Sequence, residues 1–113
     1  MNLKSIINHM LGNPDVLYIG LNDKEAVNES GDHIQVISDK KAEAIVFEYM
    51  DCSIIRMHGK YTMNGGKVVH ENSFKVEVFG KKHGELVQIA RELCVRLNQE
   101  SIIVNGEFIT AAA

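Results

Sequence analysis

The chain has 113 residues, of which 45% are hydrophobic and 24% charged, and this composition is typical of one globular domain. Its 12 lysines and arginines against 15 acidic residues give a net charge of −3, without the basic excess of a general DNA or RNA binder. No apolar run approaches the roughly 18–20 residues that span a bilayer, and we expect no signal peptide or membrane partner. Cys52 and Cys94 predict reduced thiols in a cytosolic protein.

The N-terminal part of the chain carries a helix pattern followed by a strand pattern. Apolar residues three and four apart predict a short amphipathic helix in residues 1–14, ended by Gly12 and Pro14. Residues 16–21 are apolar on both faces of an extended chain, which favours a central strand. We expect a polar loop after this strand, with a short extended piece at residues 33–37.

The middle of the chain predicts a helix and a β-hairpin. Ser38 is a good N-cap, and the spacing of the apolar residues after it predicts a core helix that ends near Asp51. Two strand patterns, at residues 53–63 and 67–79, flank Asn64-Gly65-Gly66, whose residues tolerate the positive φ angles of a tight turn.

The register of this hairpin can be argued from its turn. A two-residue Gly65-Gly66 turn places the larger apolar residues on one face, whereas the alternative register sets Met57 beside Ser73, which is less favourable. The favoured register predicts the cross-strand pairs Met57–Phe74, Gly59–Asn72 and Tyr61–His70. It also directs His58 and His70 to opposite faces, so we expect no metal site between them.

The C-terminal part contains the clearest helix pattern, an apolar stripe from Leu86 to Leu97. A strand pattern follows at residues 101–104. Asn105-Gly106 then predicts a second hairpin that returns through residues 107–109.

Together these elements predict one α+β domain over residues 1–113, with an N-terminal helix or arm at 1–14 and a core at 16–110. The core order β-α-β-β-α-β is ferredoxin-like, which means an antiparallel sheet with two helices on one face. A short N-terminal helix and a C-terminal hairpin extend it. The second face of the sheet needs a cover, so we expect the chain to form a homo-oligomer.

The candidate ligand site is the sheet face around Gly59, because a strand glycine often marks the close approach of another group. In the favoured register Tyr61 and Asn72 lie there, where the ring can stack on a planar base and the amide can hydrogen-bond its edge. A plainer interpretation is a partly exposed aromatic at the open end of a hairpin. Motifs for phosphate loops, dinucleotide folds, zinc sites and nucleophilic serines are absent from the sequence, so we expect no catalytic residue, metal or cofactor.

A second polar cluster runs from Asn98 to Ser101, between the last helix and the next strand. Helix capping and turn chemistry explain most of it, although Gln99 is longer than a typical cap, which makes Asn98 and Gln99 candidate ligand contacts. Arg91 and Arg96 complement the dipole of the last helix, and they suit phosphate recognition if they reach a shared cleft.

Three segments resemble a known family. They are Tyr18-Ile19-Gly20-Leu21-Asn22-Asp23-Lys24, then Gly59-Lys60-Tyr61 with Glu71-Asn72-Ser73, and finally Leu97-Asn98-Gln99-Glu100-Ser101-Ile102-Ile103-Val104. Together they resemble the phage-encoded Thoeris anti-defence sponges over about residues 16–104 and, more loosely, a family of small uncharacterised bacterial proteins. The helix before the first strand and the loop after Lys24, which lacks a run of acidic and threonine residues, depart from that pattern.

The resemblance implies a function without catalysis. Such proteins bind and hide a cyclic ADP-ribose isomer, made by a bacterial TIR-domain protein on infection, so that its effector in the host cytoplasm stays inactive. Some are dimers assembled into hexamers, with separate sites for cyclic di- or trinucleotides. The resemblance implies that Tyr61 stacks on the base, that Asn72 holds it, and that arginines hold the diphosphate. The candidate arginines are Arg56, Arg91 and Arg96.

Three other interpretations stay open. The generic β-α-β-β-α-β order also fits a ferredoxin-like regulatory module that binds another small metabolite. A small enzyme would need a titratable pair, for which His70 and Tyr61 are the candidates. The last alternative is an anti-defence protein that blocks another protein by surface contact.

Overall fold

The computed structural model describes residue 3 and residues 14–111, so the predicted N-terminal helix lies almost wholly outside the described residues. The described elements are, in chain order, β1 (Asp15–Gly20), β2 (Asn22–Val27), β3 (His33–Gln35), α2 (Asp39–Tyr49), β4 (Cys52–Thr62), β5 (Val68–Val78), α3 (His83–Arg96), β6 (Ser101–Val104) and β7 (Glu107–Thr110). Five strands form one antiparallel sheet in the order β4-β5-β1-β6-β7, and β2 pairs with β3 in a small second sheet.

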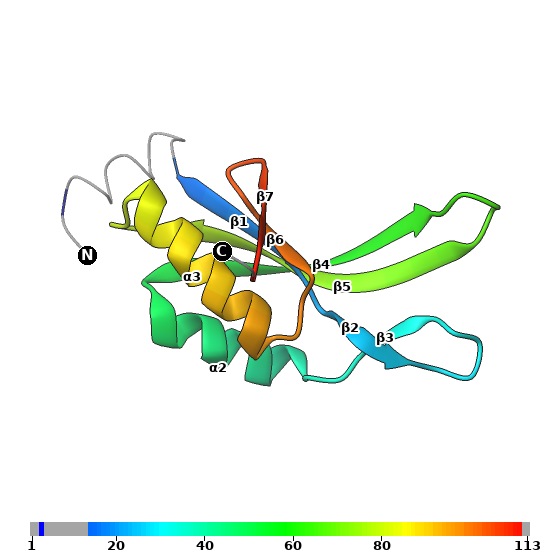
Figure 1. Cartoon of the computed structure of the whole chain (residues 1–113). Helices are drawn as coiled ribbons and strands as arrows, with labels where there is room; N and C mark the ends of the chain where they lie inside the picture. Colours follow the sequence, from blue (N-terminus) through cyan, green and yellow to red (C-terminus); the bar gives the residue numbers. More distant parts are fainter. Residues whose placement is uncertain (1–2, 4–13, 112–113) are drawn as a thin grey trace.

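This architecture is the ferredoxin-like α+β fold that the sequence predicts. The core strands β1, β4, β5 and β6 take the order second-third-first-fourth in the sheet, and the predicted C-terminal hairpin adds β7 at one edge. Helices α2 and α3 lie on one side of the sheet, and the long β4–β5 hairpin extends well past them (Figure 1). We call the other side of the sheet the open face.

Alternation along the strands decides which side chains enter the core. In β1, Leu17 and Ile19 are fully buried toward the helices, whereas Tyr18 is 40% exposed on the open face. The fully buried side chains that fill the space between sheet and helices include Phe74, Val76, Val46, Leu86 and Leu93. Ser38 caps α2 as predicted, because its side chain accepts a hydrogen bond from the Lys41 N–H at 3.2 Å.

The predicted register of the hairpin is wrong by one residue. Met57 lies opposite Ser73, and the turn is a three-residue loop closed by a 2.7 Å hydrogen bond from the Met63 N–H to the Lys67 carbonyl. Both glycines of the loop have positive φ, 93° and 88°. The physical reason is the loop: with both glycines at positive φ, Asn64-Gly65-Gly66 forms a three-residue turn that shifts β4 by one residue and leaves exposed Arg56, not Met57, beside the buried Phe74.

The second sheet replaces most of the predicted polar loop. The short extended piece is confirmed as β3, but β2 was not predicted, because its sequence is mostly polar and charged. The β2–β3 segment lies below the far half of the hairpin in Figure 1. An ion pair between Lys67 of the hairpin and Asp32 of the β2–β3 segment, with a 2.5 Å N–O distance, joins these two parts of the chain.

Candidate functional site

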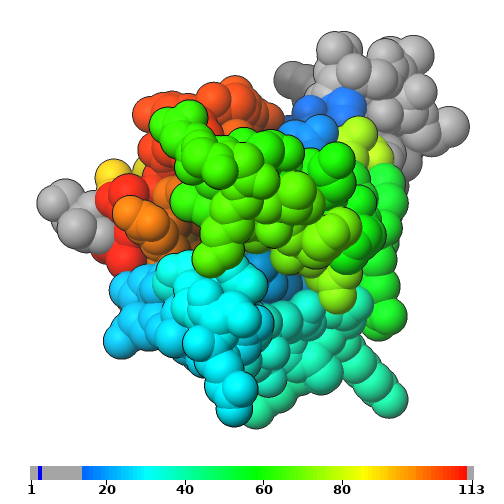
Figure 2. Space-filling view, turned by 90° about the vertical axis from the view of Figure 1, so that its right-hand side faces the viewer, coloured from blue at the N-terminus to red at the C-terminus, as the bar shows by residue number. Residues whose placement is uncertain are grey.

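The candidate functional site is a groove on the open face. One hollow of about 370 Å³ lies between the β2–β3 segment, the hairpin and the turn after α3. A second, of about 460 Å³, continues over β1, β6 and β7. Both are bordered by Tyr61, Glu71, Gln99 and Glu100, so we treat them as one surface and call it the Glu71 groove. Figure 2 shows the molecule hollowed where the β2–β3 segment meets the hairpin.

Glu71 is held against the end of β1. Its Oε2 accepts a hydrogen bond from the Asn22 N–H at 3.0 Å, while Oε1 has no hydrogen-bond partner among the described residues. The carboxylate lies over Gly20, where an added Cβ would stand 2.8 Å from both oxygens. Gly20 is therefore the glycine that permits the close approach of a protein group, and the expectation that Gly59 leaves room for a ligand stays a prediction. A Cβ at Gly59 would meet only a backbone oxygen, 3.7 Å away.

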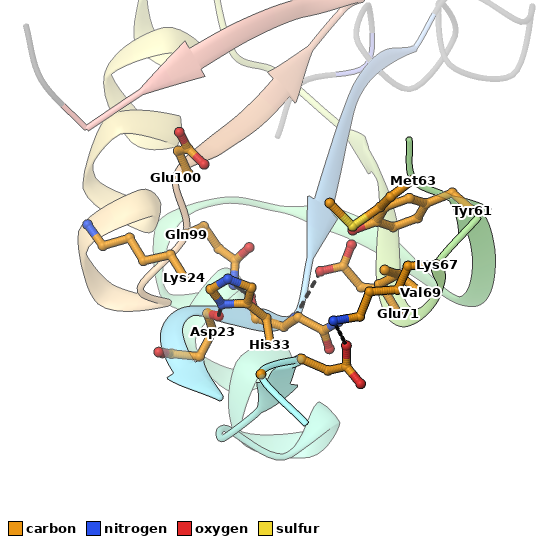
Figure 3. Close-up of a pocket in the computed structure, with 13 residues that line it drawn as sticks. Asp23, Lys24, His33, Tyr61, Met63, Lys67, Val69, Glu71, Gln99 and Glu100 are labelled. Atoms are coloured by element: carbon orange, nitrogen blue, oxygen red, sulfur yellow. Dashed lines mark hydrogen bonds and ion pairs between the residues drawn. The ribbon is translucent and has the colours of Figure 1, made fainter. Parts of the chain in front are cut away.

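Gln99 is a buried polar side chain at the floor of the groove, with 7% of its surface exposed. Its Nε2 donates to the carbonyl oxygens of Asn22 at 2.8 Å and Leu97 at 3.2 Å. Its Oε1 has no hydrogen-bond partner among the described residues, and the side chain borders both hollows. Figure 3 shows Gln99 and Glu71 on either side of the same open space. A ligand that donates hydrogen bonds would satisfy both acceptors.

Asn98, next to Gln99, connects the end of α3 to β2. It adopts a positive φ of 48° at the end of α3. Its Nδ2 donates to Asp23 Oδ1 at 2.9 Å, and its carbonyl accepts from the Lys24 N–H at 3.0 Å. These bonds fasten β2 to the turn that carries Gln99, and so position the floor of the groove.

The charges around the first hollow are mostly negative. Four carboxylates border it, against two lysines and one histidine. The Lys67 ammonium lowers the pKa of Asp32, and a hydrogen bond from the Ala26 N–H, followed by one from Asn98, lowers the pKa of Asp23. Both groups are therefore carboxylates at neutral pH, and Lys67 is already paired with one of them.

The structure does not bring the predicted arginines to Tyr61. Arg56 Nε donates to Glu43 of α2 at 2.8 Å, and Arg91 Nη1 donates to the Thr110 carbonyl at 3.1 Å. Arg96 pairs with Glu48 at 2.5 Å, and its guanidinium lies 5.6 Å from the centre of the Tyr49 ring. These three arginines stabilise the helices and the last strand, and none borders the Glu71 groove.

Asn72 is also separated from Tyr61. Tyr61 lies opposite Val69 and Asn72 opposite His58, so the two side chains face opposite sides of the hairpin. Of the predicted ligand residues, Tyr61 and Gln99 border the groove together and Gly59 lies on the same face opposite Glu71, whereas Asn72, Asn98 and the three arginines do not border it. Sequence reasoning missed Glu71 and Glu100. The correct register would have revealed Glu71, because it places that carboxylate directly opposite Gly59.

The fold and the groove together define a ferredoxin-like α+β domain with an acidic surface site. No protein-family model matches the chain, and no curated protein matches it. A solved structure described as a phage SAM lyase in the apo state is similar, with a TM-score of 0.54 and 24% identity, over 88% of this chain and 89% of that one. This likeness supports the fold. No helix of the described part of the chain is long and apolar enough to cross a membrane.

Proposed function

We propose that this chain is a phage anti-defence protein whose Glu71 groove binds and cleaves S-adenosylmethionine (SAM). The observation that carries the proposal is the polarity of the groove, which offers carboxylates, an amide oxygen and an aromatic ring. SAM presents complementary groups: a sulfonium, an ammonium and the adenine amino group. The description of the similar structure as a phage SAM lyase supports the same ligand.

Electrostatics favours a cation over a dianion in this groove. Lys24 and Lys67 are outnumbered by the carboxylates, and Lys67 is paired with Asp32. A unit charge about 4 Å from a carboxylate interacts with it by about 4 kcal/mol at an effective dielectric constant of about 20. A sulfonium therefore gains attraction where a diphosphate would meet repulsion. The Tyr61 ring, 52% exposed, can stack on adenine or lie against the cation.

Cleavage of a sulfonium is within reach of such a simple site. One carbon–sulfur bond breaks, its electron pair goes to sulfur, and a neutral thioether leaves. The carbon that loses sulfur forms its new bond within the same molecule, to an oxygen of the SAM carboxylate, so no proton has to be removed. The positive charge disappears as the bond breaks, so a groove that shields the sulfonium from water favours the reaction. We assign Glu71 the role of holding and orienting the cationic part of SAM.

Incubation of the purified chain with SAM tests the proposal. We expect SAM to disappear and a neutral thioether such as methylthioadenosine to form, both followed by chromatography and mass spectrometry. Glu71→Gln should weaken SAM binding, seen as a rise in the KM for SAM of at least about tenfold, because it removes about 1.4 kcal/mol or more of charge interaction with the bound cation. Glu77→Gln, on the same strand and face but outside the groove, is the matched control.

The outcomes separate cleavage from binding. Intact SAM that is retained and then released by heating would support the ligand and reject the lyase activity. The absence of both binding and SAM loss would reject the whole proposal.

A sponge for a cyclic ADP-ribose isomer is the second candidate. Tyr61 and the two lysines at the border of the groove favour it, because an ammonium can contact a phosphate. The test mixes the chain with the isomers, denatures it by heat and assays the supernatant. Release of intact ligand supports a sponge, consumption supports an enzyme, and failure of excess protein to capture ligand rejects both for these isomers.

We further propose that the chain acts in the host cytoplasm as a homo-oligomer, either a dimer or a hexamer. Exposed apolar side chains lie on the open face, with Tyr18 40% exposed, Ile55 45% and Phe108 71%. Tyr18 and Phe108 also border the second hollow, so a second copy seated there would add a wall to the groove. Size-exclusion chromatography with light scattering measures the molar mass. A monomer at all micromolar protein concentrations would contradict this proposal.

A further inference from the structure

Two histidines meet on the face of the hairpin that lies opposite the Glu71 groove. The register pairs His58 with Asn72 and Lys60 with His70, so both imidazoles lie on one face. The Nε2 atom of His58 is 3.3 Å from the Nδ1 atom of His70. The ring centres are 5.4 Å apart, the ring planes differ by 18°, and both residues are exposed. The predicted register had placed these histidines on opposite faces, and that prediction is wrong.

A chain of hydrogen bonds determines which nitrogen of His58 carries the proton. Gln35 Nε2 donates to the Ile37 carbonyl at 2.8 Å and to Asp39 Oδ1 at 2.6 Å. Gln35 Oε1 is therefore the acceptor that faces Asn72, whose Nδ2 donates to it at 3.1 Å. Asn72 Oδ1 then accepts at 2.8 Å from His58 Nδ1, which must be protonated. In the neutral ring, His58 Nε2 thus keeps a free electron pair and points it at His70.

We propose that His58 and His70 form a two-imidazole site for a divalent transition metal ion of the zinc, nickel or copper type. Two nitrogens that bind one ion tetrahedrally at about 2.0–2.1 Å lie about 3.3–3.4 Å apart, which matches the separation of these two atoms. The oxygen of Asn72 on the other nitrogen of His58 is the kind of contact that orients a metal-binding imidazole.

The remaining features of the site follow from its surroundings. His70 would bind through Nδ1 as the tautomer protonated on Nε2, and its exposed ring can turn toward an ion held by His58 while the Asn72 contact keeps His58 in place. Among the described residues no group of three or more histidine, cysteine, aspartate or glutamate side chains could hold a metal ion. Water therefore completes the coordination.

Neighbouring charges set the strength of binding. Lys60 lies directly opposite His70, and its positive charge opposes the binding of a cation. Arg56, two residues before His58 on the same face, is paired with Glu43. We therefore expect Lys60 to weaken the binding of the ion, and Lys60→Gln should bind zinc several-fold more tightly.

Calorimetric titration of the whole untagged chain with zinc chloride tests the site. We expect one ion per chain and a loss of affinity of at least tenfold in His58→Gln and in His70→Gln. His83→Gln is the matched control, since His83 begins α3 and its closest acidic partner is Glu107 at 3.8 Å. Saturating zinc should raise the Tm of the parent chain and of the control. It should leave the Tm of His58→Gln and of His70→Gln unchanged. Circular dichroism checks that each variant is folded.

Electron paramagnetic resonance of the unsubstituted chain with one equivalent of Cu²⁺ is a second measurement, independent of how the variants fold. Two bound imidazole nitrogens should appear in its splitting pattern. A pattern without two nitrogens, or equal zinc affinity in the parent, His58→Gln and His70→Gln proteins, would overturn the proposal. The site does not rest on the proposed SAM activity, so either can fail alone.

Discussion

Replacement of Gly20 by alanine tests whether the Glu71 carboxylate is held by space as well as by hydrogen bonding. The added Cβ would lie 2.8 Å from both carboxylate oxygens and 2.9 Å from the carboxyl carbon. Atoms do not pack this closely, so the carboxylate must move. When it moves, it loses the 3.0 Å hydrogen bond from the Asn22 N–H.

The size of the effect follows from these contacts. A hydrogen bond to a charged group contributes about 1.5–3 kcal/mol, and alanine in a strand recovers about 0.5–1 kcal/mol relative to glycine. Gly20→Ala should therefore lower the free energy of unfolding by roughly 0.5–2.5 kcal/mol. At about 4 °C per kcal/mol for a domain of this size, the Tm should fall by about 2–10 °C.

A double-mutant cycle in urea isolates the cause. In a Glu71→Ala background the new methyl group meets no carboxylate, so Gly20→Ala should be neutral or slightly stabilising there. If Gly20→Ala costs the same in both backgrounds, the steric argument is wrong. The single variant should also slow SAM cleavage, because it displaces Glu71 from the groove.

Three further predictions concern other parts of the chain. Tyr61→Ala should weaken SAM binding about 5- to 30-fold in calorimetry by removing about 1–2 kcal/mol of ring contact, whereas Asn72→Ala, on the opposite face, should leave it unchanged. Arg96→Ala breaks an exposed ion pair with Glu48, so urea titration should show a loss of no more than about 1 kcal/mol, with SAM binding intact. Burial raises the pKa of Cys52 from 9.0 to about 11, so the stability that its neutral thiol contributes is complete below pH 9 and declines toward pH 11. Urea titrations from pH 8 to 10.5 should show a smaller decline in Cys52→Ser.

Apolar periodicity is what made the fold predictable. The stripe from Leu86 to Leu97 became α3 (His83–Arg96), and the apolar run at residues 16–21 became the central strand β1. Such patterns predict structure well because every apolar side chain on the buried face adds to the stability of the fold. The polar run Asn22–Val27 has no such signal, and its strand is held by hydrogen bonds such as the one from the Asn98 side chain to Asp23, which no periodicity encodes.

The register of the hairpin was less predictable, because the residue pattern of two strands does not include the rest of the sheet. Within the hairpin alone, Met57 opposite Phe74 is the favourable pair, since two large apolar side chains would share a face. In the whole sheet Phe74 already faces the core opposite Ile19, and the three-residue loop sets β4 accordingly. The facing of β5 depends on its other neighbour, β1, and a comparison of β4 with β5 alone does not include that strand.

The one-residue difference in register changes which cross-strand partners Glu71 and Asn72 have. As neighbours in β5 they face opposite sides, with Glu71 over Gly20 and Asn72 against His58. The amide expected to recognise a base therefore belongs to the histidine pair, and its acidic neighbour occupies the groove. Asn22 touches both faces, since its N–H holds Glu71 and its Nδ2 donates to the His70 carbonyl at 3.1 Å. Metal binding and SAM cleavage should accordingly respond to different side-chain substitutions, and any coupling between them should pass through β2.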